Sequence, residues 1–325
     1  MLLLKKQLNA DGLYMIDSTS IHPESVSVII VTYQSKDIIS ATLSSLTKLE
    51  NKALLKIIVI DNASTDGTAE CIEKEFPAVM LIRNSYNIGF GRGCNQGFLY
   101  VKTPFVLLLN PDAVIDINSI MVLVKFMKKT PKAGICGPAV KEASGNLQPS
   151  GGRVAPWKII LKPLLPRMAS RGQHHVVPGE EPRLTDWICG SVMLIRYEMI
   201  KKIGTFDPRF FLYFEETDLI IRTQQAGWEI WTVGKATAEH VNAASAKATQ
   251  KEMIWGTIAE HYFRSRFYFL KKHYGLLQAI LAETGELVCM IIRSVLDIIR
   301  GRSYNSVKLR IKAPFFKYPT GPEEK

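Results

Sequence analysis

Two stretches of the chain place carboxyl and amide groups where chemistry is expected. The first is the apolar run 105–109, which is followed at once by Asn110, Pro111 and Asp112. The run is long enough for a buried strand and too short for a stable helix, and Pro111 ends regular structure just before the acid. Because open α/β sheets bind ligands at the carboxyl ends of their strands, Asp112 is a candidate site residue. An ordinary strand end closed by an Asx turn is the alternative.

The second stretch is acidic and lies behind a run of aromatic residues. Glu215, Glu216 and Asp218 follow the segment 206–214, at the expected start of a helix that also contains Arg222. The helix macrodipole favours acids at this end, which accounts structurally for one or two of them. A carboxylate that is positioned by a helix terminus and partly desolvated is also suited to act as a general base.

The elements that must position these groups alternate along the first part of the chain. Buried strands are expected at 26–32, 56–60 and 79–82, with amphipathic helices at 37–49 and 68–76 between them. This order predicts a parallel sheet with right-handed crossovers. Further expected elements are a strand at 105–112, a helix at 118–130, a strand at 133–140, a strand-like stretch at 184–196 centred on Gly190 and Ser191, and a strand at 229–233.

The loop 84–97 contains four glycines, but they do not have the spacing of either common phosphate-binding motif. A flexible turn that enters a closely packed helix explains the glycines. A backbone that approaches a diphosphate is the second interpretation of this loop.

Composition and charge limit the class of protein. The 325 residues are 47% hydrophobic, which suits one large or two modest globular domains. The net charge of +11 predicts an anionic partner. Charge alone does not distinguish among nucleic acid, a phosphorylated small molecule and a membrane surface. The five cysteines have no paired spacing, so we expect neither a zinc site nor a disulfide framework, and a reducing cytoplasmic location.

Three segments outside the expected sheet bear on location. Residues 1–25 form a polar leader without the features of a signal peptide. The segment 150–185 begins with a basic and apolar stretch that is interrupted by prolines. It predicts either a mobile flap that binds an apolar, anionic surface, or a loop that folds back on the core. The segment 246–325 is expected to be helical, and 276–299 contains too many charges for a spanning helix.

Aromatic and basic residues interleave in the C-terminal segment. The default interpretation is a set of helices that pack on the main domain with a basic outer face. The pattern also fits single-stranded nucleic acid or an amphipathic membrane-surface region.

Six motifs in a fixed order carry a resemblance to a known family. They are Val28-Ile-Ile-Val-Thr-Tyr33, Val59-Ile-Asp-Asn-Ala-Ser-Thr-Asp-Gly67, Asn87-Ile-Gly-Phe-Gly-Arg-Gly-Cys-Asn95, Leu107-Leu-Leu-Asn-Pro-Asp112, Phe206-Asp-Pro through Asp218-Leu219, and Glu239-His240. Spread over about residues 26–245, they resemble family 2 glycosyltransferases, in particular the bacterial rhamnosyltransferase-like branch. The resemblance implies a GT-A fold: a single Rossmann-like, mostly parallel twisted sheet flanked by helices in residues 26–245, with a C-terminal helical extension in residues 246–325.

The resemblance also implies roles for individual residues. Asp112 matches the last position of the family's metal motif and His240 the second metal ligand, for Mg²⁺ or Mn²⁺. Asn110 occupies the first position of that motif, where the family has an acid, so substrate phosphates are expected to supply ligands. The residues implied to bind the nucleotide sugar are Thr32, Tyr33, Asp61, Asn62, Asn87, Gly89, Asn95, Asn110 and Arg222.

The same resemblance assigns the catalytic acids. Glu216 matches the general base, while Glu215 is its neighbour in the motif and Asp218 supports the helix, together with Arg222 on the diphosphate side. A single base without a covalent nucleophile implies inversion at the anomeric carbon, as in the family.

We therefore expect an inverting, metal-dependent glycosyltransferase on the cytoplasmic face of the plasma membrane. Its donor would be dTDP-rhamnose or a UDP-sugar, and its acceptor a lipid-linked or polysaccharide intermediate of cell-surface glycan synthesis. The basic aromatic C-terminal helices would contact the membrane, and no nucleic acid is expected because the acidic clusters would repel a phosphate backbone. A non-catalytic nucleotide-sugar-binding scaffold of a glycan assembly complex is the alternative.

Overall fold

In a computed structural model of the chain, the described residues are 7–8, 14–15, 24–47, 54–152, 173–241 and 257–300. Most of the expected leader and the centre of the expected flap, residues 153–172, lie outside these ranges. Two short strands near the N-terminus, β1 (Gln7–Leu8) and β2 (Tyr14–Met15), pair with each other.

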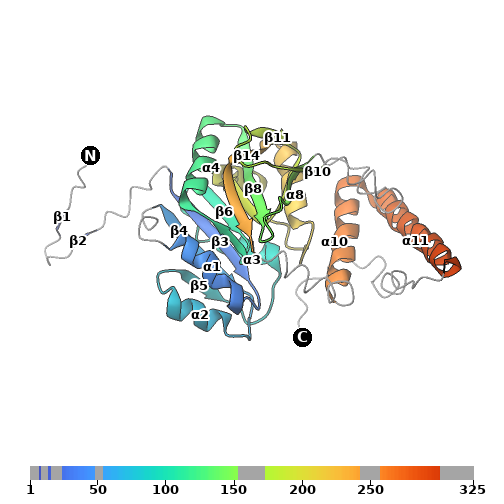
Figure 1. Cartoon of the computed structure of the whole chain (residues 1–325), viewed down its shortest axis with the longest axis horizontal. Helices are drawn as coiled ribbons and strands as arrows, with labels where there is room; N and C mark the ends of the chain where they lie inside the picture. Colours follow the sequence, from blue (N-terminus) through green and yellow to red (C-terminus); the bar gives the residue numbers. More distant parts are fainter. Residues whose placement is uncertain are drawn as a thin grey trace.

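A large mixed sheet forms the centre of the molecule (Figure 1). Its strand order is β11-β14-β8-β13-β6-β3-β4-β5, and β7 pairs with β14 beside this path. The pairs β5-β4, β4-β3, β3-β6 and β8-β14 are parallel, while β13 is antiparallel to both of its neighbours. The bounds are β3 Val26–Thr32, β4 Leu55–Asp61, β5 Met80–Arg83, β6 Phe105–Leu109, β7 Ala113–Ile115, β8 Ala133–Glu142, β11 Arg183–Thr185, β13 Val192–Arg196 and β14 Glu229–His240.

Helices cover both faces of this sheet, because the central strands are apolar on both sides. Val28 and Ile30 of β3 face one hydrophobic cluster, while Ile29 and Val31 face the other. The first face is covered by α1 (Lys36–Leu46), α2 (Thr68–Glu75) and α4 (Ile117–Lys129). The second face is covered by α3 (Phe90–Phe98), α7 (Tyr197–Ile203) and α8 (Glu215–Gln225). The predicted α/β architecture is confirmed.

Two predicted elements have different bounds in the structure. The stretch 184–196 is not one strand: β11 is followed by β12 (Trp187–Ile188), a turn at 189–191 and β13. The division arises because β12 pairs with β9 (Pro149–Gly152) in a separate small sheet, which also contains β10 (Gln173–His175), whereas β11 pairs with β14. The strand predicted at 229–233 continues as β14 to His240, because its second half pairs with β7 and β8.

The predicted C-terminal helices are present as α10 (Thr257–Tyr274) and α11 (Leu276–Ile299), joined at Gly275, whose φ is +94°. They lie side by side at one end of the molecule, beyond α8 (Figure 1). The aromatic residues of α10 point inwards: Phe267 and Phe269 are buried in a third cluster together with Phe210 of the main domain. Among the helices of the described residues, none is long and apolar enough to cross a membrane.

Candidate active site

The first part of the candidate site lies where β3 and β4 end. Thr32 and Asp61 are paired in register at the carboxyl ends of these parallel strands, and each is only 1% exposed. Asp61 Oδ2 accepts a hydrogen bond of 3.1 Å from the backbone N–H of Ser64. Within the described part of the chain, Asp61 Oδ1 and Thr32 Oγ1 are buried without any hydrogen-bond partner. Tyr33 comes next in the chain and is half exposed, so an aromatic side chain lies beside these two buried polar groups.

A hydrogen-bonded loop lies beside the end of β4. Asn62 donates to the Gly89 carbonyl at 3.2 Å, and Asn87 accepts from the Gly89 N–H at 2.9 Å. Gly89 has a φ of +86°, and a Cβ atom at this position would lie 2.4 Å from the Phe211 carbonyl oxygen. The glycine is therefore required both by its backbone conformation and by the close approach of the segment that leads to α8.

Asn95 has a different setting from the rest of the predicted donor-binding set. Its side-chain amide donates to the Phe206 carbonyl at 2.8 Å and accepts from the Phe206 N–H at 3.0 Å. It thereby ties α3 to the aromatic segment before α8. The structure gives Asn95 a structural role, and its predicted contact with the donor stays a prediction.

Asp112 and His240 meet at the other side of the sheet edge. Asp112 follows β6 and is 8% exposed, and His240 is the last residue of β14. His240 Nε2 lies 3.0 Å from Asp112 Oδ1, while His240 Nδ1 lies 3.1 Å from Gln148 Oε1. When Nδ1–H donates to Gln148, Nε2 has the lone pair that a metal ligand needs.

This pair fits a divalent cation. A carboxylate oxygen and an imidazole nitrogen that lie 3.0 Å apart could together hold Mg²⁺ or Mn²⁺. Asn110 occupies the adjacent turn and is half-buried. Among the described residues no group of three His, Cys, Asp or Glu side chains is placed to hold a metal. Asp112 and His240 would thus contribute two ligands, and the other positions would be left to a phosphorylated substrate or water.

Glu215 and Glu216 begin α8 and face the same region. Glu215 is 4% exposed and Glu216 is half-buried, and the Oε2 atom of each has no hydrogen-bond partner among the described residues. Burial raises the pKa of both carboxyls, and the charge of Glu216 raises the pKa of Glu215 further. A carboxyl with a raised pKa near a ligand site is a general-base candidate.

The turn 189–191 contacts both Asn110 and Glu216. The backbone N–H of Asn110 donates to the Ser191 carbonyl at 2.9 Å, and Glu216 packs against Gly190. Burial raises the pKa of the Cys189 thiol, and the charges of Glu216 and Asp112 raise it further. Asp112 and Glu216 therefore both lie near this turn.

Two consecutive aromatic residues set the start of α8. Tyr213 and Phe214 have φ values of +69° and +68°, a left-handed conformation that is uncommon for bulky side chains. Tyr262 of α10 contacts both, with ring centroids 5.7 Å from Tyr213 and 5.5 Å from Phe214. Packing by α10 thus holds the strained segment that delivers Glu215 and Glu216.

Asp218 and Arg222 point away from this region. Asp218 is fully buried and binds Arg222 at 2.8 Å, Lys272 at 2.5 Å and His273 at 2.8 Å. Arg222 also donates to the carbonyls of Ile203 and Thr205 near the end of α7. These contacts show that both residues help to hold α7, α8 and α10 together. Their predicted roles in catalysis and donor binding stay predictions.

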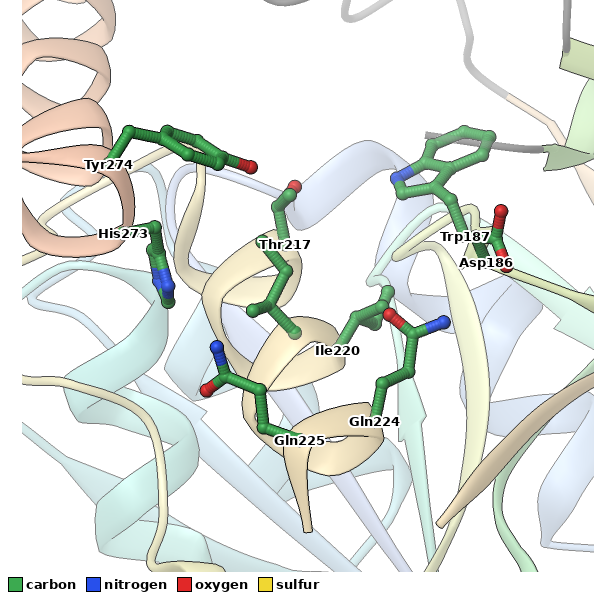
Figure 2. A pocket seen from close by; sticks show the side chains of 9 residues that line it. Asp186, Trp187, Thr217, Ile220, Gln224, Gln225, His273 and Tyr274 are labelled. Atoms are coloured by element: carbon green, nitrogen blue, oxygen red, sulfur yellow. The ribbon is translucent and has the colours of Figure 1, made fainter. Parts of the chain in front are cut away.

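A pocket of about 220 Å³ opens between α8, the end of α10 and β12. Trp187 and Tyr274 stand on opposite sides of it with Thr217 between them (Figure 2). Its floor includes Ile220 and Gln224 of α8. Thr217 adjoins Glu216 in the chain, so this pocket lies next to the acidic start of α8.

Several contributing residues were not predicted as site residues. Gln148 reaches His240 from a segment 92 residues earlier, and no local motif surrounds it. Cys189, Gly190 and Ser191 form a turn inside a stretch whose apolar pattern predicted a strand. The Gly-Ser pair was the available signal for that turn.

Comparison with known proteins decides the family. The model described as "Glycosyl transferase family 2" matches residues 27–204, more than half of the chain. This chain belongs to glycosyl transferase family 2.

Two curated relatives support the rhamnosyltransferase-like resemblance. The N-acetylglucosaminyl-diphospho-decaprenol L-rhamnosyltransferase of Mycobacterium tuberculosis (strain CDC 1551 / Oshkosh) is 28% identical over 308 residues, covering 87% of this chain and 98% of the relative. Rhamnosyltransferase WbbL of Escherichia coli (strain K12) is 24% identical over 225 residues, covering 66% of this chain and 83% of that protein.

A solved structure agrees with the predicted fold. GalNAc-T7, crystallised with UDP, GalNAc and Mn²⁺, has a TM-score of 0.55 and 18% identity, covering 83% of this chain and 53% of that one. The family 2 glycosyltransferase has a GT-A fold, as predicted, with helices at its C-terminus.

Proposed function

We propose that this family 2 glycosyltransferase moves a sugar from a nucleotide-diphosphate donor, dTDP-rhamnose or a UDP-sugar, to a hydroxyl group of a lipid-linked or polysaccharide acceptor, with inversion. The acceptor class is supported by the Mycobacterium tuberculosis relative, whose name describes rhamnosyl transfer to a diphospho-decaprenol-linked N-acetylglucosamine. We place this reaction in cell-surface glycan synthesis, on the cytoplasmic side of the plasma membrane.

One observation carries the proposal. Thr32 Oγ1 and Asp61 Oδ1 are buried and lack hydrogen-bond partners among the described residues, and both lie at the carboxyl ends of paired parallel strands, where α/β folds bind ligands. A buried polar atom without a partner costs about 1–3 kcal/mol, so two of them on paired residues are explained by a polar ligand. In this proposal the base and ribose of the donor bind at Thr32, Tyr33 and Asp61.

The diphosphate end of the donor is assigned to the opposite part of the edge. Asp112 and His240 would hold Mg²⁺ or Mn²⁺, and Asn110 would adjoin the phosphates. When bound, the cation would offset the charge that develops on the leaving diphosphate. Gln148 positions the His240 ring through Nδ1, which favours the orientation in which Nε2 faces Asp112.

Glu216 is our candidate for the base that takes the proton of the acceptor hydroxyl. It is more accessible than Glu215, and it lies against Gly190, in the turn that also contacts Asn110. With no nucleophile assigned, the acceptor oxygen itself attacks the anomeric carbon from the face opposite the diphosphate, and the configuration inverts. The acceptor would enter through the pocket between Trp187 and Tyr274, since aromatic faces suit the apolar faces of sugar rings.

Calorimetric titration tests the donor site directly. UDP-sugars and dTDP-sugars, including dTDP-rhamnose, would be titrated into the wild type, Asp112→Asn and the exposed control Asp37→Asn, with Mn²⁺, with Mg²⁺ and with a chelator. We expect one donor to bind only with metal, and to bind the control but not Asp112→Asn. Binding of a donor that is equal with chelator and in Asp112→Asn favours the scaffold alternative, and no binding by any donor rejects the proposed function.

A further inference from the structure

The outward side of α11 is a continuous apolar stripe. Nine large aliphatic residues along it are 42–74% exposed: Leu277, Leu281, Val288, Ile291, Ile292, Val295, Leu296, Ile298 and Ile299. At 100° per residue these positions fall within an arc of about 160°, and the 24-residue helix is about 36 Å long. A continuous apolar surface of this length is unusual on a soluble monomer and marks an interaction site.

Two acids of α11, Glu283 and Glu286, lie on its inward side. Glu283 is 3% exposed and lies 3.7 Å from Arg266 of α10, which is itself 3% exposed. Glu286 pairs with the same guanidinium group. A surface helix of a globular protein normally turns its apolar stripe to the core and its charges to solvent. In α11 this arrangement is reversed, so the apolar stripe is not explained by packing within the described chain.

The shape and charge of the stripe select its partner. A two-helix seam between copies of the chain needs an apolar stripe only two positions wide per seven residues, flanked by charged side chains. This stripe is much broader, and basic side chains lie near its two ends. Lys271 lies in the last turn of α10, and Arg300 is exposed directly after α11. Basic ends around an aliphatic face suit anionic headgroups above acyl chains.

We propose that α11 is a lipid-binding helix that lies in the plane of an anionic bilayer, with this stripe at the boundary between headgroups and acyl chains. The inference deepens the proposed function and rests on it for the location of the acceptor. It also replaces the predicted contact surface, because the aromatic residues of α10 are buried and the exposed aliphatic residues of α11 are not.

The docked helix would place the acceptor pocket at the membrane. His273 and Tyr274 line that pocket, and Tyr274 is separated from the start of α11 only by Gly275. His273 and Lys272 also bind Asp218 of α8, the helix that begins with Glu215 and Glu216. A lipid-linked acceptor held in the same bilayer would therefore meet the pocket without leaving the membrane.

Vesicle sedimentation of the full chain tests the lipid surface. The stripe variant Leu281→Glu/Ile292→Glu would be compared with Leu99→Glu/Leu184→Glu, which makes the same kind of change at residues that are 80% and 57% exposed on the main domain. Vesicles would contain phosphatidylcholine alone or mixed equally with phosphatidylglycerol. We expect wild type and control to bind the anionic vesicles, more weakly at 0.5 M NaCl, and the stripe variant to bind at least tenfold less, with unchanged circular dichroism.

Two results would overturn the lipid assignment. One is equal vesicle binding by the stripe variant and the wild type. The other is a wild type that ignores vesicles but sediments as a dimer, which the stripe variant makes monomeric, because this would assign the stripe to a second copy. Calorimetric titration of the same samples with the donor tests the proposed reaction independently. Vesicle binding without donor binding would therefore reject the proposed reaction and leave the lipid surface in place.

Discussion

The two neighbouring acids at the start of α8 have different surroundings, although sequence makes them look equivalent. Glu215 is almost fully buried beside the charge of Glu216, whereas Glu216 is half-buried and adjoins Gly190. We therefore propose Glu216 as the base and give Glu215 a buried supporting position. This difference has a consequence for stability.

Replacing Glu215 with Gln should stabilise the protein in a pH-dependent way. The folded-state pKa of Glu215 is raised by burial, whereas an unfolded Glu has a pKa of about 4.3. As pH rises above that value, the unfolded state ionises while the folded state still holds its proton, so wild-type stability falls until the folded pKa is passed. Urea unfolding should show little gain for Glu215→Gln at pH 4.5 and a clear gain at pH 8. The exposed Glu198→Gln should show no gain, and an equal gain at both pH values would contradict the raised pKa.

At the scale of elements, α8 is fixed from two sides. Asp218 joins it to α10 through Lys272 and His273 and, through Arg222, to the end of α7. The segment that enters α8 passes Gly89, where the backbone of the donor-side loop touches Phe211. The positions of Glu215 and Glu216 thus depend on contacts with residues far from them in the chain.

Asp218→Asn should weaken the junction of α8 and α10. Burial raises the pKa of Asp218, but hydrogen bonds from His273, Lys272 and Arg222 outweigh this effect and lower the pKa below its usual value. The carboxylate therefore stabilises the fold above pH 4, and its contribution is lost as pH falls through the folded pKa. Removing the charge leaves Arg222 without its carboxylate partner, while Lys272 keeps Asp207 at 2.8 Å, so we expect a loss of about 3 kcal/mol in urea unfolding at pH 7. The exposed Asp37→Asn serves as control, and a loss below about 1 kcal/mol would argue against the network.

Gly89→Ala should cost more than an alanine at another glycine of the same conformation. Gly89 has a φ of +86° and a Cβ clash at 2.4 Å, whereas Gly204 has a φ of +83° and nothing within 4 Å. Backbone strain of about 1–3 kcal/mol is common to both substitutions, so the excess at Gly89 measures the contact with Phe211. Thermal unfolding should show the larger loss for Gly89→Ala, with weaker donor binding by calorimetry. Equal losses of stability in the two variants would mean that the segment at Phe211 shifts to accept the extra methyl group at little cost.

For the whole molecule, the proposed donor and acceptor sites are built from different parts. The donor edge comes from parallel strands and the loops that follow them, while the acceptor pocket adds β12 and α10. Substitutions in the pocket should therefore change the binding of the acceptor without changing the binding of the donor.

Trp187→Ala should raise the KM for the acceptor by about tenfold or more and leave the Kd for the donor unchanged. The expected reason is the loss of one aromatic wall of the pocket, a contact of about 1–2 kcal/mol. Steady-state kinetics with a lipid-linked acceptor, together with donor calorimetry, would measure both. Tyr100→Ala, on the exposed surface after α3, is the control. An unchanged acceptor KM would remove the pocket from the proposal.

The sequence predicted the layered fold and the strand ends that carry Thr32, Asp61 and Asp112, because apolar runs and turn residues are local signals. It did not predict the contacts of Asp218, since Lys272 and His273 lie more than fifty residues away. Gln148 and the turn at Cys189 were missed for the same reason: their positions depend on sheet pairing. Packing of α10 on the main domain was the default expectation from the sequence, but its contacts with Phe210 and Phe214 could not be predicted, because they join distant segments.

The central claim is that Glu216 takes the acceptor proton at a donor site formed by the sheet edge. The most direct test is sugar transfer to a lipid-linked acceptor by Glu216→Gln and wild type, with donor affinity measured on the same preparations. Loss of a general base should lower kcat by about 10²–10⁴-fold, with donor Kd unchanged. Transfer by Glu216→Gln at the wild-type rate would contradict the account.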